Sequence, residues 1–158
     1  MNSQTRLLTP LEAAEATSNT TPFYAAYPMR EWALVKKIRQ MTNNDVCGEL
    51  CSLRLTWLRP KSQADDSKTF LFQTLPWLLD AAWALADSEL LALHIEQVHS
   101  ANNLFALAMF ANNVAAEIEA CECLPNSMTA THFIKANFKH GHITNQPLAG
   151  HFNEEGSI

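Results

Sequence analysis

Alternation of apolar and polar residues dominates the second half of the chain, and this period of two is typical of half-buried β-strands. It predicts five consecutive strands, over residues 90–99, 104–111, 114–124, 131–139 and 142–148. The turns at Asn112 and Asn113 and at His140 and Gly141 contain residue types that tolerate a positive φ. Consecutive strands joined by such turns predict an antiparallel meander.

Two further strands are predicted in the first half of the chain. Residues 49–59 (ELCSLRLTWLR) alternate, with Cys51, Leu53, Leu55 and Trp57 on one face and polar residues on the other. Residues 23–27 (FYAAY) form a short aromatic run that ends at a proline, which is typical of a strand end.

Two early segments have helical features. Residues 9–17 (TPLEAAEAT) begin with a capping-box pattern, in which a threonine and a proline precede a glutamate, and predict a short helix. In residues 30–41, Leu34, Val35 and Ile38 recur at helical spacing while charged residues occupy the opposite face. This pattern predicts a helix that lies on a core.

Residues 70–86 are apolar almost all round and predict a buried helix. Because Pro76 has no backbone N–H to donate, we expect this helix to begin near Pro76, with Thr74 as its cap, and to end near Ala86. The polar residues 60–68 before it are predicted to form a loop.

Together these elements predict an α+β fold in which helices pack on one face of an open, mainly antiparallel sheet. In residues 104–111 both alternating sets are apolar, so the second face of the sheet also needs cover. That cover is either a lid over a ligand or a second subunit, since uncovered apolar faces of that size are rare in monomers. We expect a homodimer through the open face.

Composition narrows the function classes. The 158 residues are 47% hydrophobic and 17% charged, which indicates a single folded domain. The net charge of −5 argues against nucleic acid as a partner, and the sequence shows neither a membrane span nor a signal peptide. A cytoplasmic location is therefore expected. The four scattered glycines leave no phosphate-binding loop of the Rossmann or P-loop kind.

The cysteines, histidines and paired glutamates give weaker signals. A four-thiolate zinc site is suggested by two close cysteine pairs, Cys47 with Cys51 and Cys121 with Cys123. Their spacing differs from that of zinc knuckles, so we prefer the interpretation that the cysteines are small apolar side chains on strands. The six histidines form no triad or metal pattern. The two glutamates at 117 and 119 share a strand face, where a solvated or salt-bridged edge is preferred over glycosidic chemistry.

Several local sequences resemble one known family. The runs FYAAYPMREW, VKKIRQMTNNDVCGELCSLRLTW, FLFQTLPWLLDAAWAL and NNLFALAMFANNVAAEIEACECLP are similar to the C-terminal domain of the Gfo/Idh/MocA oxidoreductases. The resemblance covers about residues 8–148. It implies a glyceraldehyde-3-phosphate-dehydrogenase-like C-terminal domain without a Rossmann domain, with its core at about 23–149 and peripheral residues 1–22 and 150–158. In the family this domain supplies much of a sugar or polyol pocket and subunit contacts.

The resemblance also exposes departures from the family. The motif D-x-G-x-H-x-x-D aligns on Asp80 and places Gln73, Leu75 and Trp77 where the family has Asp, Gly and His. The family's catalytic lysine has no counterpart beside Pro10. Because tryptophan cannot shuttle a proton near neutral pH, no catalytic residue is assigned.

The candidate substrate-binding residues are those able to grip hydroxyl groups or stack on a sugar ring. They are Arg30, Trp57, Arg59, Gln73, Trp77 and Asp80, with Arg54 as a further pocket residue. Core roles for the tryptophans and a helix-end role for Arg30 are the alternatives. Asp80, inside an apolar helix, must either hold Arg54 or Arg59 or face a polar cavity.

The resemblance thus implies a substrate-binding and assembly domain of an oxidoreductase that is inactive alone. No cofactor is expected on this chain itself, and NAD or NADP is implied for a full-length protein or for a partner Rossmann domain or subunit. The alternative is a non-enzymatic ligand-binding or dimerisation module that kept the fold and lost the chemistry.

Overall fold

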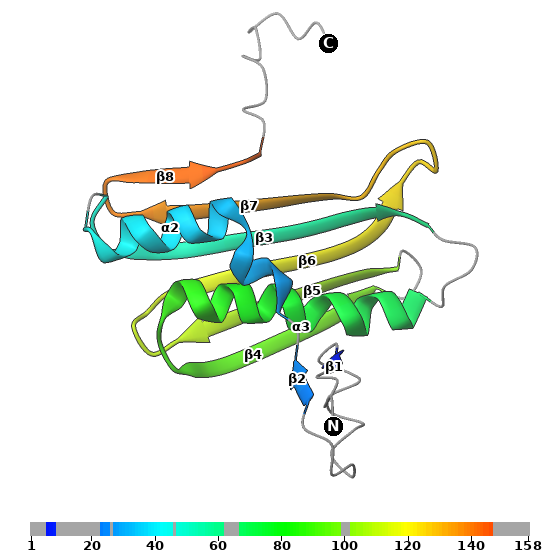
Figure 1. Ribbon diagram of the computed structural model, residues 1–158, viewed down its shortest axis with the longest axis horizontal. Coiled ribbons are helices and arrows are strands. Elements are labelled where there is room, and N and C mark those ends of the chain that lie inside the picture. Colours follow the sequence, from blue (N-terminus) through cyan, green and yellow to red (C-terminus); the bar gives the residue numbers. More distant parts are fainter. Residues whose placement is uncertain are drawn as a thin grey trace, which may run out of the picture.

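A six-stranded mixed sheet forms the centre of the protein, and two helices cover one of its faces (Figure 1). The computed structural model describes residues 6–8, 23–25, 27–45, 47–61, 67–98 and 102–146. The strands are β3 (Leu50–Pro60), β4 (Leu90–Val98), β5 (Asn103–Phe110), β6 (Ala115–Leu124), β7 (Thr131–Phe138) and β8 (Gly141–Thr144). Their order across the sheet is β4-β5-β6-β3-β7-β8. The predicted class, an α+β fold with an open and mainly antiparallel sheet, is confirmed.

The predicted meander is wrong at one place. Strands β4, β5 and β6 pair consecutively, and so do β7 and β8, but β3 lies between β6 and β7. It pairs in parallel with β6 and antiparallel with β7. The centre of the sheet therefore depends on a strand from the first half of the chain, a long-range pairing that local alternation does not encode.

The helical elements on the covered face are η2 (Pro28–Glu31), α2 (Ala33–Asn43) and α3 (Ser67–Ala86). The helix predicted over 30–41 is found as α2, which begins three residues later, after η2, and has Val35 and Ile38 buried against the sheet. The predicted start of α3 near Pro76 is wrong, because the helix begins at Ser67 and Pro76 lies inside it. The sequence is apolar on both sides of Pro76, and one missing backbone donor does not end the helix there.

The core lies between these helices and the sheet. Leu53 and Leu55 of β3 and Ile118 of β6 are buried under Leu78 and Leu85 of α3. A bulge between Leu50 and Ser52 breaks the alternation at the start of β3. For this reason Leu50 is in the core and Cys51 is exposed, contrary to the predicted face.

Two turns show how the sheet ends are built. Asn113 adopts a positive φ of 64° between β5 and β6, as expected for that turn. Neither His140 nor Gly141 does so, and β8 already begins at Gly141.

Gly48 has a φ of 74°, and a Cβ there would stand 3.0 Å from Cδ2 of His140. A side chain at this position would meet both backbone strain and a close neighbour.

The N-terminal part of the chain contributes a separate pair of short strands. Strand β1 (Arg6–Leu8), which the sequence pattern did not predict, pairs in parallel with β2 (Phe23–Ala25). The predicted strand 23–27 is thus shorter, and the helix predicted over 9–17 lies outside the described residues.

Among the described residues, no helix has both the length and the apolar character to cross a bilayer.

Candidate functional site

Arg30 and Asp80 form a bidentate ion pair between η2 and α3. Nε of Arg30 lies 2.7 Å from Oδ2 of Asp80, and Nη2 lies 2.5 Å from Oδ1. The Asp80 side chain is 10% exposed and that of Arg30 is 49% exposed. The hydrogen bond to Asp80 raises the pKa of Arg30. The predicted partners of Asp80, Arg54 and Arg59, are wrong, because both arginines bind other carboxylates.

The pair also borders a hollow of about 580 Å³ between η2, α2 and α3. Its wall includes Tyr27, whose ring lies under the Arg30 guanidinium at 5.6 Å, and the exposed Trp83. Asp80 therefore faces a polar cavity, as one of the two expectations had it, and the arginine that it holds is Arg30 instead of Arg54 or Arg59.

An aromatic cluster forms where β3, β7 and the two helices meet. The Trp57 ring lies 6.1 Å from that of Trp77 and 5.9 Å from that of Trp32, measured between centroids. The His132 ring lies 3.9 Å from Trp32 and 5.9 Å from Trp57. The sequence singled out Trp57 and Trp77 but missed Trp32 and His132. The register that pairs Trp57 with His132 brings strands 75 positions apart together, and no local pattern indicates it.

Two features give this cluster binding potential. Trp77 Nε1 is buried and has no hydrogen-bond partner within the described part of the chain. A hollow of about 320 Å³ lies beside the cluster, lined by Trp32, Leu34, His132 and Asn145, among others. Burial by these neighbours lowers the pKa of His132, so the imidazole is held neutral. Trp32 and His132 line this hollow, whereas Trp57 and Trp77 do not, so a polyhydroxy ligand there would meet the Trp32 ring and the neutral imidazole.

Arg59 forms a third, separate arrangement at the end of β3. Its Nε and Nη2 lie 3.0 and 2.7 Å from Oε1 of Glu122, whose side chain is fully buried. Glu122 Oε2 has no hydrogen-bond partner among the residues described. The geometry fits a structural ion pair between β3 and β6.

Two candidates remain, Gln73 and Arg54. Gln73 belongs to α3, one turn before Trp77, and its side chain lies outside the described residues. Arg54 lies on the opposite face of the sheet, where it binds Oε2 of Glu117 at 2.6 Å through Nε. The sequence candidates therefore do not form one pocket: Arg30 with Asp80, Trp57 with Trp77, and Arg59 are distinct sets on the covered side.

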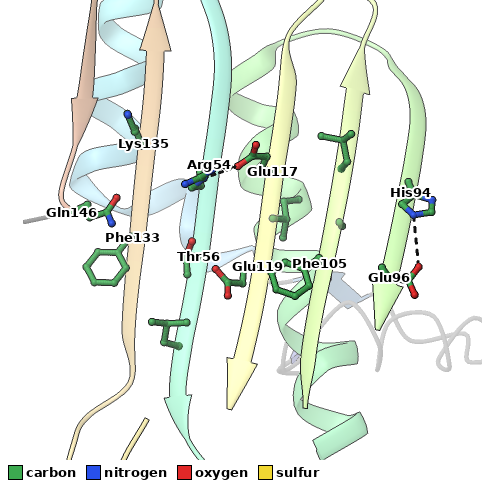
Figure 2. Close-up of a pocket in the computed structure, with 14 residues that line it drawn as sticks. Arg54, Thr56, His94, Glu96, Phe105, Glu117, Glu119, Phe133, Lys135 and Gln146 are labelled. Atoms are coloured by element: carbon green, nitrogen blue, oxygen red, sulfur yellow. Dashed lines mark hydrogen bonds and ion pairs between the residues drawn. The ribbon is translucent and has the colours of Figure 1, made fainter. Parts of the chain in front are cut away.

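A further hollow, of about 620 Å³, lies on the open face of the sheet (Figure 2). It is lined by apolar rings, Phe105 and Phe133, and by charged side chains of neighbouring strands. On β5, exposed Phe105, Leu107 and Met109 alternate with buried residues. The prediction that both faces of this strand are apolar is confirmed.

The cysteines do not form the suggested zinc site. Cys51 stands at the start of β3, whereas Cys121 pairs with Leu58 near the other end of the same strand. Seven residues of strand separate the two positions by roughly 23 Å. Burial raises the pKa of Cys121 to about 12, so its thiol stays protonated. No three potential metal ligands come together among the described residues.

Comparison with known proteins identifies a fold class. No protein-family model matches the sequence, and no curated protein matches it. Solved structures do match, and dehydrogenases of several bacteria are among them. This chain therefore shares its fold with part of these dehydrogenases, and the resemblance seen in the sequence is confirmed at that level.

Three structures illustrate the match. A probable dehydrogenase from Thermotoga maritima has 13% identity and a TM-score of 0.64, over 83% of this chain and 43% of its own. A dehydrogenase from Chromobacterium violaceum has 19% identity and a TM-score of 0.64, over 84% and 40%. Myo-inositol dehydrogenase from Lactobacillus casei, solved with NAD(H) and myo-inositol, has 10% identity and a TM-score of 0.65, over 85% and 42%. This chain spans less than half the length of each.

Proposed function

We propose that this chain is the substrate-binding and assembly domain of a Gfo/Idh/MocA-like oxidoreductase that acts on a sugar, a polyol or a related small molecule. The observation that carries the proposal is the fold match, which takes in most of this chain but less than half of each dehydrogenase. Hydride transfer then requires a cofactor domain from another segment or subunit, and this chain alone is inactive. The domain itself has its core at about 23–149.

The proposed substrate site is the aromatic cluster of Trp32, Trp57, Trp77 and His132. Indole rings stack on the apolar C–H faces of sugars and cyclitols, while the buried Trp77 N–H needs an acceptor. Asp80 lies three residues beyond Trp77, so both are on one face of α3. That spacing favours a contribution of the Arg30–Asp80 pair near the stacking platform, although the pair borders a separate hollow.

NAD or NADP is the cofactor that the proposal implies, and it is assigned to the partner domain. A dinucleotide needs backbone N–H groups of a glycine-rich turn at a helix N-terminus. Gly48, the glycine with a positive φ among the described residues, precedes a strand instead. The described residues therefore do not fit the cofactor.

Assembly is proposed to take place through the open face, as a homodimer in the cytoplasm. Phe105, Leu107 and Met109 are each about 40% exposed there, beside a hollow lined by apolar rings and charged side chains. Burying such side chains contributes about 25 cal/mol per Å² of apolar surface.

Titration of the isolated chain with NADH and NADPH, followed by nucleotide fluorescence, tests the proposal. We expect no saturation at micromolar nucleotide and no turnover with polyols. Micromolar binding of either nucleotide would contradict the assignment of the cofactor to another domain.

The second candidate function is a non-enzymatic binding module, and Trp77 favours it. This residue occupies the position where the family resemblance places the acid–base histidine, and its indole packs on Trp57. Trp77→His in a chain supplied with a cofactor domain separates the two candidates. A gain of turnover supports the oxidoreductase domain, whereas binding without any gain supports the module.

A further inference from the structure

The hollow between η2, α2 and the second half of α3 has exposed aromatic rings in its wall. Tyr27 and Trp83 line it, and their exposed fractions are 36% and 49%. Tryptophan is among the side chains that proteins bury most on average, so an exposed indole at the edge of a hollow is unusual. Such a ring offers a flat apolar surface on which the ring of a ligand can stack.

Two charged side chains of the same wall have no partner within the described part of the chain. They are Arg39 of α2 and Asp87, which follows the last residue of α3. Each lines the hollow without an ion pair to the other or to a third residue described. A ligand that carries charges of both signs can therefore bind both side chains at once.

Asp87 stands where the chemistry of helix ends favours other residues. Its φ of 48° lies in the left-handed region, which glycine adopts most easily. Its carboxylate also lies at the C-terminal end of α3, where the helix dipole favours cations. Positions that break two local rules at once are expected at functional sites. The carboxylate and the helix end together favour an ammonium group.

The arginines of this hollow favour a carboxylate. Arg30 uses Nε and Nη2 to bind Asp80, and a guanidinium has further N–H donors beyond these two. Its side chain is 49% exposed at the hollow. Arg39 adds a second guanidinium in the same wall. Arginine donors match the two oxygens of a carboxylate in geometry and charge.

We propose that this hollow binds a free α-amino acid with an aromatic side chain. Arg30 and Arg39 bind its carboxylate, and Asp87 binds its ammonium group. Its ring stacks on Trp83. Because Asp80 balances Arg30, and Asp87 balances Arg39, the wall is neutral overall and suits a zwitterion. The volume of about 580 Å³ is typical of small-molecule sites.

This site goes beyond the proposed function. Its lining residues are all different from those of the hollow beside the aromatic cluster, where the polyol site is proposed. The two proposals therefore stand or fall separately, and each has its own ligand and its own variants.

Calorimetric titration of the full chain with L-phenylalanine tests the proposal. Three further ligands each lack one group: phenylpropionate lacks the ammonium, phenylethylamine lacks the carboxylate, and L-alanine lacks the ring. We expect saturable binding of L-phenylalanine with a millimolar or lower Kd, and binding about tenfold weaker or worse for each of the other three. No saturable heat with L-phenylalanine, or equal affinity for any of the other three, overturns the proposal.

Variants locate the site. Arg39→Gln, Asp87→Asn and Trp83→Leu each remove one proposed contact, and asparagine still tolerates the positive φ at position 87. Lys37→Gln and Glu89→Gln remove the same charges at exposed positions outside the wall and are the matched controls.

We expect the Kd for L-phenylalanine to rise about tenfold in each of the three site variants and to stay unchanged in the two controls. Circular dichroism establishes that each variant is folded. Folded site variants that bind as tightly as the wild type, or controls that weaken binding as much as the site variants, overturn the proposal.

Discussion

Arg30 in η2 donates two hydrogen bonds to Asp80 in α3, at 2.7 and 2.5 Å, and so ties together segments fifty residues apart. The carboxylate is mostly buried in an apolar helix, where an unpaired charge would be costly. Because the bond to Asp80 raises the pKa of Arg30, the guanidinium stays charged over the whole working range of the protein. The pair fixes η2, and with it the start of α2, against α3.

Replacing Arg30 tests this role. Arg30→Met keeps the length of the side chain but leaves the Asp80 charge buried alone. We expect a loss of about 2 kcal/mol in the free energy of unfolding by urea, below the full value for a buried pair because Arg30 is 49% exposed. Lys36→Met breaks the exposed pair with Glu31 and is the control, with no measurable loss expected. Equal losses in the two variants would contradict a structural role for the Arg30–Asp80 pair.

The Arg59–Glu122 pair makes a different prediction, because here the carboxylate is fully buried. Arg59→Met leaves that charge stranded, and we expect it to cost about 3 kcal/mol of stability. Arg59→Met with Glu122→Met replaces both charges by apolar groups and should recover most of this loss. A double-mutant cycle in urea measures the coupling, and losses that simply add would show that the two residues act independently.

Trp77→Phe removes an indole N–H that is buried without a partner among the described residues. The relief of that unsatisfied donor, worth about 1–3 kcal/mol, offsets the lost ring contact with Trp57. We therefore expect a change in thermal stability smaller than that caused by Trp57→Phe, whose ring contacts Trp32, Trp77 and His132. A larger loss from Trp77→Phe would mean that the N–H is satisfied and does not await a ligand.

His132 predicts a dependence of stability on pH. Burial lowers its pKa in the folded state, so the unfolded chain binds the proton more readily. The stability from the neutral imidazole is complete above about pH 6.5, the ordinary value, and is lost as the pH falls through the folded pKa. Urea midpoints measured from pH 7.5 to 5 should fall less steeply in His132→Gln than in the wild type. His142→Gln, on β8, is the control, and identical slopes in all three proteins would rule the effect out.

The sequence pattern was sufficient for the six strands of the main sheet and for α2, but not for β1, because period-two and helical spacing are local signals and β1 has only three residues. Each predicted strand in the second half of the chain is found within a few residues of its expected bounds. The start of α3 was missed because a proline is a common helix boundary, whereas this helix begins at Ser67 and continues through Pro76. The insertion of β3 between β6 and β7 was missed because strand order depends on pairing between distant residues.

The candidate site was predictable in its residue types but not in its arrangement. The position of Asp80 inside an apolar helix predicts a charged or hydrogen-bonding partner, since a buried carboxylate must be paired. Which arginine supplies it depends on how η2 folds back over α3, and no spacing in the chain encodes that contact. Trp32 and His132 join the aromatic cluster for the same kind of reason, through the register of β7 on β3.

The central claim is that this chain binds a sugar or polyol without a cofactor domain. Titration of the isolated chain with myo-inositol and with glucose, followed by tryptophan fluorescence, tests it most directly, because Trp32, Trp57 and Trp77 form the proposed site. We predict a saturable change at millimolar concentrations of at least one of the two, weakened in Trp77→Phe. A signal that does not saturate with either ligand, or that is unaltered in Trp77→Phe, would contradict the account.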